Sequence, residues 1–269
     1  MKERIDTQLV TKGFFPSRER AKASIMAGIV YVDGQRCDKA GSMIDVTSEI
    51  YIKENLCPYV SRGALKLEKA FKAFNLDFKD LICMDIGAST GGFTDFMLQN
   101  GVSKVYAVDV GYGQLDWKLR NDPRVVNMEK INIRYLDPQK IPERMDFISI
   151  DVSFISLKLV FPIAALLLKE QGNLVCLVKP QFEAGRDKVG KNGIVRDPEV
   201  QIEVLHRIAG YAIARGLAVQ GITYSPVTGA KGNIEYLFLL KKTDEQSKIV
   251  YETINETVRE AHVSLGGKL

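Results

Sequence analysis

The stretch that decides the fold runs Leu81-Ile-Cys-Met-Asp-Ile-Gly-Ala-Ser-Thr-Gly-Gly-Phe93 and continues into Thr94-Asp-Phe-Met-Leu98. Its first residues are apolar and predict a buried strand, and its last residues predict the start of a helix. A glycine-rich turn stands between them, and glycine lets the backbone approach a ligand closely because it has no Cβ. Asp85 ends the strand two residues before Gly87, where it could meet a cationic or amino-bearing ligand. The stretch therefore predicts a nucleotide-type cofactor loop.

Spacing distinguishes this loop from a dinucleotide fingerprint. That fingerprint is G-x-G-x-x-G, whereas Gly87 is followed here by three other residues and then by Gly91-Gly92. A second acid, Asp109, ends the apolar run Val105–Asp109. It lies roughly 20 residues beyond the glycines, where such folds place a carboxylate that binds a ribose. A tight turn that binds nothing and a solvated aspartate remain the alternatives.

Length and composition describe a globular chain. Its 269 residues suffice for one large domain and a small one, and 46% of them are apolar and 26% charged. The net charge of +4 permits a polyanionic partner without identifying one. The chain starts with charged residues and contains no apolar run long enough to cross a bilayer, so we expect a cytoplasmic protein with no membrane partner.

Cysteines and histidines give no sign of a metal site. The cysteines show no CxxC spacing, so buried, reduced thiols are expected. His206 and His262 lie in helical patterns away from any motif, which argues against zinc and against histidine-based chemistry. The cysteines are Cys37, Cys57, Cys83 and Cys176.

Residues 1–55 predict a small α+β module. Arg4–Val10 and Arg18–Met26 predict two short amphipathic helices. Gly28-Ile-Val-Tyr-Val-Asp-Gly34 predicts a strand and a turn, and Ile50–Ile52 a later strand. The whole pattern resembles the S-four-type RNA-binding domain, named after a ribosomal protein, and this resemblance implies RNA binding.

Cations of this module would contact the phosphates of RNA, which gives affinity without reading sequence. A solvated charged helix face is the alternative, since Glu19 and other acids dilute the positive charge. The candidate RNA contacts in and just after the module are Arg4, Arg18, Arg20, Lys22, Arg36 and Arg62.

The remainder of the chain predicts a larger α/β domain. Lys53-Glu-Asn-Leu-Cys-Pro58 ends the module, and we place a linker at residues 56–60 and the second domain at 61–269. Helical stretches separate most of its apolar runs, as in a parallel, doubly wound sheet. The last two runs are separated only by residues 225–233 and should pair as an antiparallel hairpin. The runs are Leu81–Asp85, Val105–Asp109, Phe147–Asp151, Leu174–Lys179, Val219–Tyr224 and Ile234–Leu240.

Ionisable residues stand where several of these buried strands end. Asp151 and Lys179 each close a strand, and the carboxyl ends of parallel strands line the ligand crevice of such a sheet. Glu235 lies at the start of a strand that runs the opposite way, so it should reach the same edge. Lys66 lies on the preceding predicted helix, Ser61–Phe74. A single lysine at a strand end usually reaches out to water, but four such residues on one edge indicate a site.

Five stretches make a family resemblance specific. They are Tyr59-Val-Ser-Arg-Gly-Ala-Leu-Lys-Leu67, Asp85-Ile-Gly-Ala-Ser-Thr-Gly-Gly-Phe93, Ile150-Asp-Val-Ser-Phe154, Val178-Lys-Pro-Gln-Phe-Glu183 and Gly232-Asn-Ile-Glu-Tyr236. Together they resemble, over nearly the whole chain, the TlyA (hemolysin A) family. These ribosomal RNA 2′-O-methyltransferases combine an S-four-type domain with an FtsJ-like Rossmann domain.

The resemblance implies a Rossmann-like class I methyltransferase with a mostly parallel seven-stranded sheet that ends in an antiparallel hairpin. It implies the catalytic tetrad Lys66, Asp151, Lys179 and Glu235, with S-adenosylmethionine as cofactor. Thr90 replaces the proline usual in the FtsJ cofactor loop, which should not remove binding. The implied cofactor residues are Asp85, Gly87, Ala88, Ser89, Thr90, Gly91, Gly92, Phe93, Asp109, Val110, Asn132 and Asp151.

The implied substrate is ribosomal RNA or a ribosomal subunit rather than DNA. The family suggests a cytidine of large-subunit RNA, with small-subunit RNA as a second potential target, and leaves the oligomeric state open. The long loop Gln181–Arg196 would contact RNA, although a disordered surface loop is the alternative. Its candidate contacts are Arg186, Lys188, Lys191 and Arg196.

Methyl transfer to a ribose hydroxyl is an in-line displacement that depends mainly on position. Lys179 is the candidate base for the hydroxyl proton. A free lysine is protonated at neutral pH, and the sequence leaves open whether Lys66 or the two carboxylates dominate its surroundings. A membrane-active hemolysin, a catalytically silent RNA-binding protein and a base methyltransferase are the other hypotheses. Asp151-Val-Ser-Phe154 lacks the Pro-Pro-aromatic motif common in base-amine methyltransferases.

Overall fold

The structure is a computed structural model that describes residues 2–15, 17–26, 28–53, 58–245, 247 and 251–265. The chain divides into two units, Met1–Pro58 and Tyr59–Leu269. Residues 54–57 lie outside the described residues, and they include Cys57 and the first two residues of the predicted linker 56–60. Cys37, Cys83 and Cys176 are buried free thiols, as expected.

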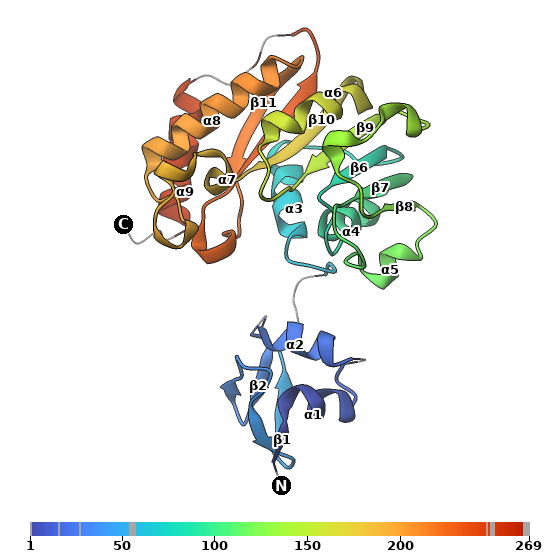
Figure 1. Ribbon diagram of the computed structural model, residues 1–269, viewed down its shortest axis with the longest axis vertical. Helices are drawn as coiled ribbons and strands as arrows, with labels where there is room; N and C mark the ends of the chain where they lie inside the picture. Colours follow the sequence, from blue (N-terminus) through green and yellow to red (C-terminus); the bar gives the residue numbers. More distant parts are fainter. Residues whose placement is uncertain are drawn as a thin grey trace. The chain divides into compact units, whose positions relative to one another are not determined.

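The N-terminal unit has a small α+β fold (Figure 1). Strand β1 (Lys2–Arg4) pairs with β4 (Met43–Asp45), and β2 (Val30–Val32) lies between β3 (Gln35–Arg36) and β5 (Ile50–Ile52). Helix α1 spans Ile5–Thr11, and α2 spans Arg18–Met26 as predicted. Apolar side chains of both helices and of β2 form its core, namely Ile5, Leu9, Ala21, Ile25 and Val30. The sequence did not predict β1 and β4, because strands of three residues show too little alternation to stand out.

The second unit is built on a seven-stranded sheet with the order β11-β12-β10-β9-β6-β7-β8. Strand β12 is antiparallel to both of its neighbours, and the pairs from β10 to β8 are parallel. The predicted sheet with its C-terminal hairpin is thus confirmed. The strands are β6 (Ile82–Ile86), β7 (Lys104–Val108), β8 (Val125–Met128), β9 (Met145–Ile150), β10 (Leu168–Val178), β11 (Leu217–Tyr224) and β12 (Tyr236–Lys242).

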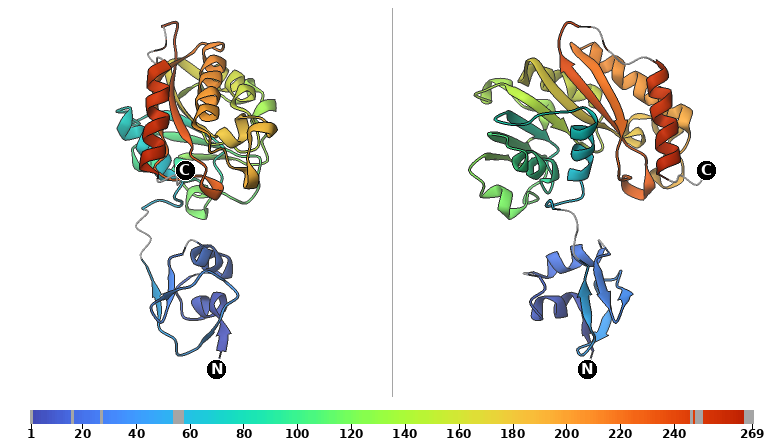
Figure 2. Two further views of the ribbon diagram at one scale, coloured as in Figure 1. Left: turned by 90° about the vertical axis from the view of Figure 1, so that its left-hand side faces the viewer. Right: turned by 180° about the vertical axis from the view of Figure 1, so that it is seen from behind.

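Helices cover the sheet with two apolar clusters. One cluster joins buried side chains of α3 (Ala64–Ala73) and α4 (Gly92–Gln99) to Phe147 and Leu237 of the sheet. The other joins α6 (Phe161–Leu167), α8 (Pro198–Ile213) and α9 (Tyr251–Ser264) to alternate side chains of the strands. Figure 1 shows α8 and α9 side by side, and Figure 2 shows α9 (red) beside β11. Leu67 and Ala70 of α3 are buried against the sheet.

Short segments complete the unit. The four-residue helices α5 (Trp117–Arg120) and α7 (Pro180–Glu183) follow β7 and β10. Further 3-10 turns are η1 (Ile133–Tyr135), η2 (Pro138–Lys140), η3 (Leu157–Leu159), η4 (Arg186–Lys188), η5 (Lys191–Gly193) and η6 (Ala230–Gly232). The predicted loop 181–196 is therefore partly ordered, containing α7, η4 and η5. None of the helices in the described residues is long and apolar enough to cross a membrane.

Candidate active site

The glycine loop joins the end of β6 to the start of α4, and two of its glycines have conformations that other residues rarely adopt. Gly87 has φ +87°, and a Cβ there would collide with the backbone carbonyl of Asp151 at the end of β9. Gly91 has φ +93°, and a Cβ there would collide with Leu119 of α5. Gly87 therefore lets two strand ends meet, whereas Gly91 lets α4 begin against a neighbouring helix.

Asp85 is buried beneath this loop and holds it in place. Its Oδ2 accepts hydrogen bonds from the backbone N and the Oγ1 of Thr94, at 3.0 and 2.7 Å, and its Oδ1 accepts one from Ser149 Oγ at 3.1 Å. Burial raises the pKa of Asp85 to about 7, although these hydrogen bonds favour the charged form. Much of the hydrogen-bonding capacity of Asp85 is thus used inside the protein.

Asp109 follows β7 and faces the same loop from the other side. Its two carboxylate oxygens accept hydrogen bonds from the backbone N of Ser89, at 2.8 Å, and of Gly111, at 2.7 Å. Asp109 therefore fixes the glycine loop to the end of β7, and it also lines the large cavity beside that loop.

That cavity has a volume of about 660 Å³, within the range of about 300–1,000 Å³ typical of small-molecule sites. A smaller hollow of about 130 Å³ adjoins it, and Gly87, Ser89 and Asp151 line both. Of the predicted cofactor residues, all but Gly91 line one or both hollows. The large one is lined by Gly87, Ser89, Asp109, Val110, Asn132 and Asp151, and the small one by Asp85, Gly87, Ala88, Ser89, Thr90, Gly92, Phe93 and Asp151.

The four ionisable residues predicted to converge do so around the carboxylate of Asp151. Lys66 Nζ lies 3.3 Å from Asp151 Oδ2 and 2.9 Å from Glu235 Oε2. Lys179 Nζ lies 2.6 Å from Asp151 Oδ1 and donates a hydrogen bond to Ser153 Oγ at 2.9 Å. The side chains of Lys66, Lys179 and Glu235 are 13%, 9% and 3% exposed, so their charges interact with little screening by water.

Charge pairing controls the protonation of this cluster. Burial would raise the pKa of Asp151, but the ammonium groups of Lys179 and Lys66 outweigh it and lower that pKa below its ordinary value. Burial would lower the pKa of Lys66, but Asp151 and Glu235 outweigh it and raise that pKa. Asp151 therefore stays a carboxylate and Lys66 stays an ammonium at neutral pH.

Sequence reasoning missed several residues that complete the site. Ser153 accepts the hydrogen bond of Lys179, and Gln181 Nε2 donates to Glu235 Oε1 at 3.1 Å. Phe154 lines the large cavity, is 89% exposed and packs on Phe182 with ring centroids 4.8 Å apart. Ser153 and Phe154 belong to the quoted motif after β9, and Gln181 and Phe182 to the one after β10. Their place in these two stretches was the one feature of the sequence that could have identified them.

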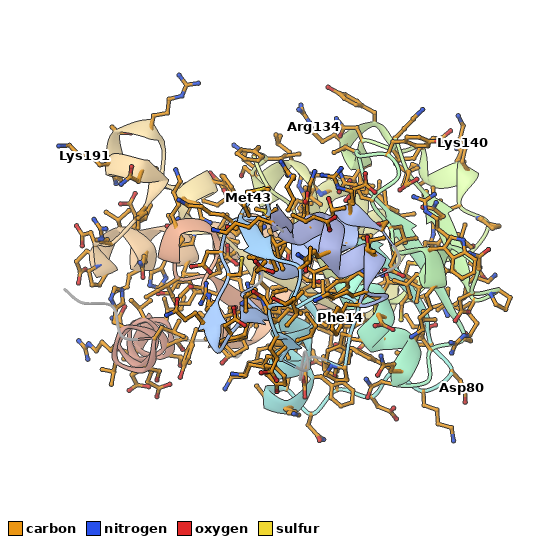
Figure 3. The ribbon with its side chains drawn as sticks, turned by 90° about the horizontal axis from the view of Figure 1, so that it is seen from below. Phe14, Met43, Asp80, Arg134, Lys140 and Lys191 are labelled. Atoms are coloured by element: carbon orange, nitrogen blue, oxygen red, sulfur yellow. The ribbon has the colours of Figure 1, made fainter. Side chains whose placement is uncertain are left out.

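The predicted RNA contacts occupy several parts of the surface. Arg4 and Arg18 are about half exposed and both pair with the buried carboxylate of Asp6. Arg36 pairs with Asp38, and Lys188 with Glu203. In the second unit, Figure 3 shows Lys191 at one side, away from Arg134, which lines the large cavity and was not among the predicted contacts. The remaining candidates, Arg20, Lys22, Arg62, Arg186 and Arg196, are exposed.

A further cavity of about 500 Å³ lies between the loops around residues 194–198 and 228–234 and the end of α9. Residues of the glycine loop and of the Lys66–Asp151–Lys179–Glu235 cluster do not line it. The cavity beside the glycine loop is therefore the candidate active site, because Asp151 connects it to the four-residue cluster.

Comparisons with known proteins identify the family of each part of the chain. A model of the FtsJ-like methyltransferase family matches residues 59–242, and a model of the S4 domain matches residues 3–50. YqxC of Bacillus subtilis, provisionally named an rRNA methyltransferase, is 51% identical over 271 residues, which cover 99% of this chain and 96% of YqxC. TlyA of Mycobacterium tuberculosis, named a 16S/23S rRNA (cytidine-2′-O)-methyltransferase, is 42% identical over 243 residues, covering 90% of this chain and 91% of TlyA.

A solved structure from Streptococcus thermophilus, provisionally named a hemolysin, is 50% identical and superposes with a TM-score of 0.80. It covers 98% of this chain, and the match covers 97% of that structure. The family model covers more than half of the chain, and these relatives match nearly all of it. The chain therefore belongs to the FtsJ-like methyltransferase family and carries an S4 domain at its N-terminal end.

Proposed function

We propose that this methyltransferase transfers a methyl group from S-adenosylmethionine to a ribose 2′-hydroxyl of ribosomal RNA. The observation that carries the proposal is the double role of Asp151. Its side chain pairs with Lys66 and Lys179, and the residue also lines both hollows beside the glycine loop. A ligand in the large cavity would thus lie next to the four-residue cluster.

The residues beside the glycine loop fit this cofactor. The absence of a Cβ at Gly87 keeps the junction of β6 and β9 open, and Asp109 lies where a ribose-binding carboxylate is expected. Asn132 and Val110 would contribute the wall around the adenosine. When bound, S-adenosylmethionine supplies a methyl group attached to a positively charged sulfur. We propose eleven of the twelve predicted residues as its contacts, and the twelfth, Gly91, as a residue that shapes the loop.

The protonation states of Asp151 and Lys66 support a division of roles within the proposed tetrad. The hydroxyl must lose its proton as the new C–O bond forms, and a lowered pKa makes Asp151 a poor base. Lys66 stays protonated between two carboxylates and so cannot accept a proton. We therefore propose Lys179 as the residue that accepts the hydroxyl proton. Asp151 and Glu235 would orient the lysines and the ribose.

Ribosomal RNA is the substrate that the N-terminal unit and the relatives support. S4 domains take their name from a ribosomal protein, and two of the cited relatives are named rRNA methyltransferases. Exposed Phe154 offers an aromatic surface at the mouth of the site, on which an unstacked base could lie. We propose a cytidine as the target, in large-subunit and also in small-subunit RNA, and the cytoplasm as the place of action.

The test uses the full chain, labelled S-adenosylmethionine, and ribosomal subunits from cells that lack this gene. We expect label at a ribose 2′-oxygen, mapped as a position resistant to alkaline cleavage. Asp109→Ala should weaken cofactor binding by ~1–3 kcal/mol in calorimetry, the scale of a lost hydrogen bond to a charged group. Label found on a base, or in neither subunit, would contradict the proposal.

A further inference from the structure

The short helix α7 follows Lys179 directly, and each of its polar side chains contacts a different part of the active site. Gln181 contacts the tetrad residue Glu235, and Glu183 contacts Ser156, the last residue of the segment 151–156 that lines the large cavity, and the adjacent Leu157. The helix itself consists of only four residues, Pro180–Glu183, so little of its position is set by its own hydrogen bonds. These side-chain contacts fix its place in the site.

Glu183 binds the far end of the cavity wall. Its Oε2 accepts a hydrogen bond from Ser156 Oγ at 2.7 Å, and its Oε1 accepts one from the backbone N of Leu157 at 2.8 Å. Ser156 lines the large cavity, and Leu157 is 2% exposed and anchored in the apolar core. Arg207 of α8 donates a hydrogen bond to the backbone carbonyl of Glu183, and this contact joins the end of α7 to α8. Glu183 therefore connects the wall of the cavity to the strand that carries Lys179.

The wall needs such support because its backbone is strained. Phe154 has φ +62°, in the left-handed region that a bulky residue rarely occupies, and its ring is 89% exposed. At one end of the segment, Ser153 accepts a hydrogen bond from Lys179. At the other end, Ser156 and Leu157 donate to Glu183. The two ends of the cavity wall are thus held by Lys179 and Glu183, which lie four residues apart in the sequence.

Gln181 acts on the other side of the site. Its Nε2 donates to Glu235 Oε1, while Lys66 occupies Glu235 Oε2. Because a carboxylate can only accept hydrogen bonds, this contact also fixes the orientation of the Gln181 amide. The backbone of Gly229 also lies close to Glu235 Oε1, because a Cβ on Gly229 would collide with this oxygen. The carboxylate is therefore held by Gln181 and Lys66 and has little room to move toward Gly229. Removing the Gln181 amide would free one oxygen of Glu235 without touching the cofactor cavity.

We propose that α7 is the positioning element of the active site and that its two polar residues have separate tasks. Glu183 holds the cavity wall that receives the cofactor, and Gln181 holds Glu235 for the chemical step. The proposal rests on the proposed function. It predicts that substitutions only two residues apart in one short helix act on different quantities, cofactor affinity for Glu183 and kcat for Gln181.

The test measures cofactor affinity by calorimetry without RNA, KM and kcat with ribosomal subunits, and thermal stability. Glu183→Ala should weaken cofactor binding ~10-fold, about one good hydrogen bond, with kcat at saturating cofactor nearly unchanged. Glu183→Gln should restore most of the affinity, since its amide oxygen can accept from Leu157 and its nitrogen can donate to Ser156. Gln181→Leu, similar in size, should leave cofactor affinity unchanged and lower kcat ~10-fold.

Glu170→Gln serves as the matched control, because Glu170 is 74% exposed and pairs with Lys242 away from the site. It should change none of these quantities. Equal losses of affinity and kcat in both α7 variants would show that α7 only stabilises the fold and would overturn the proposal. So would unchanged cofactor affinity in Glu183→Ala. If Glu183→Ala unfolds below the assay temperature, Ser156→Ala decides, since it removes the same hydrogen bond from the opposite side.

Failure of the proposed function would be visible separately. A wild-type protein that methylates no ribosomal RNA would contradict the function, whereas calorimetry with S-adenosylmethionine alone would still test the role of Glu183. Unaltered cofactor affinity in a folded Glu183→Ala protein that methylates RNA would contradict this inference alone.

Discussion

Lys66 and Lys179 contact opposite oxygens of one carboxylate, that of Asp151. Their Nζ atoms lie 3.3 Å from Oδ2 and 2.6 Å from Oδ1. The carboxylate thus separates two positive charges that would otherwise repel one another inside the protein. Lys66 has a second carboxylate partner in Glu235, whereas Lys179 donates to the neutral hydroxyl of Ser153 and its Nζ lies 5.9 Å from the centroid of the Phe182 ring. Lys66 thus pairs with two carboxylates and Lys179 with one, so the two lysines have different surroundings within the cluster.

Asp151→Ala should be among the most damaging substitutions in the chain. It would leave two buried ammonium groups with only Glu235 as a counter-charge, and breaking a buried ion pair costs about 3–5 kcal/mol. We expect the free energy of unfolding to fall by roughly 3 kcal/mol, measured by urea denaturation at neutral pH. Lys242→Ala, which removes a partly exposed ion pair with Glu170, should cost about 1 kcal/mol or less. Similar effects of the two substitutions would show that the Asp151 cluster is well solvated.

Asp85 makes a pH-dependent contribution to stability. Burial raises the pKa of Asp85 from its ordinary value near 4 to about 7. Between these values the unfolded chain loses the proton while the folded protein keeps it, so the free energy of unfolding decreases as pH rises. The destabilisation is complete above about pH 7 and absent below about pH 4.

Asp85→Asn removes this dependence and introduces an amide of nearly the same shape, whose oxygen can accept from Thr94 and whose nitrogen can donate to Ser149 Oγ. The difference in unfolding free energy between Asp85→Asn and the wild type should therefore shift in favour of the variant between pH 5 and pH 8. Urea denaturation at both pH values measures it. A difference independent of pH would mean that Asp85 ionises in the folded protein as easily as in water.

RNA affinity should depend on the paired arginines of the N-terminal unit. Asp6, fully buried, accepts hydrogen bonds from Arg4 and Arg18, and these bonds lower the pKa of Asp6 far below its usual range. The carboxylate fixes both guanidinium groups at the surface, where their remaining N–H groups can bind phosphate. Arg18→Gln in the full chain should weaken binding to ribosomal RNA and reduce the slope of log affinity against log salt by about one.

A suitable control is Lys242→Gln, which also removes one positive charge. Lys242 is the last residue of β12, and Glu235 precedes the first, so the two lie at opposite ends of this strand. This variant should keep the wild-type salt slope. If Arg18→Gln also keeps that slope, Arg18 does not contact phosphate, and its pairing with Asp6 serves the fold of the unit alone.

The order and direction of the strands explain why the sequence could predict which residues of the candidate site lie together. Gly87, Asp109, Asp151 and Lys179 all lie at strand ends, and the carboxyl ends of parallel strands must meet at one edge of the sheet. The reversed direction of β12 placed Glu235 there as well. Spacing along the chain was enough for these residues because the sheet itself supplies the distances between them. The strand β8 lay outside the predicted runs because it is short and half exposed.

Contacts between side chains of distant segments could not be predicted in the same way. Glu183 ends one of the stretches that carry the family resemblance, but the sequence gives it no partner, because its hydrogen bond with Ser156 depends on how α7 packs against the segment after β9. Asp6 was likewise one acid among the charges of a predicted helix, and its burial between Arg4 and Arg18 depends on tertiary packing. Pairings of this kind have no fixed spacing, so they become visible only in the structure.

Lys179 gives the most demanding test of the mechanism. It ends a buried strand, is 9% exposed, and contacts Asp151 and Ser153 but does not line the two hollows beside the glycine loop. If it is the base, Lys179→Ala should leave cofactor affinity in calorimetry nearly intact and cut turnover by ~10²–10⁴, the usual share of general-base catalysis.

Lys179→Arg separates a base from a fixed positive charge. Guanidinium can pair with Asp151 as an ammonium does, but it does not release its proton at accessible pH. We therefore expect Lys179→Arg to fold with near-normal stability, bind the cofactor and lose almost as much turnover as Lys179→Ala. Single-turnover methylation of ribosomal subunits, measured as initial rates, distinguishes the outcomes. A robustly active Lys179→Arg enzyme would mean that Lys179 supplies only positive charge, because the arginine of the variant cannot act as a base. The hydroxyl proton would then have to pass to water or to the weakly basic carboxylate of Asp151.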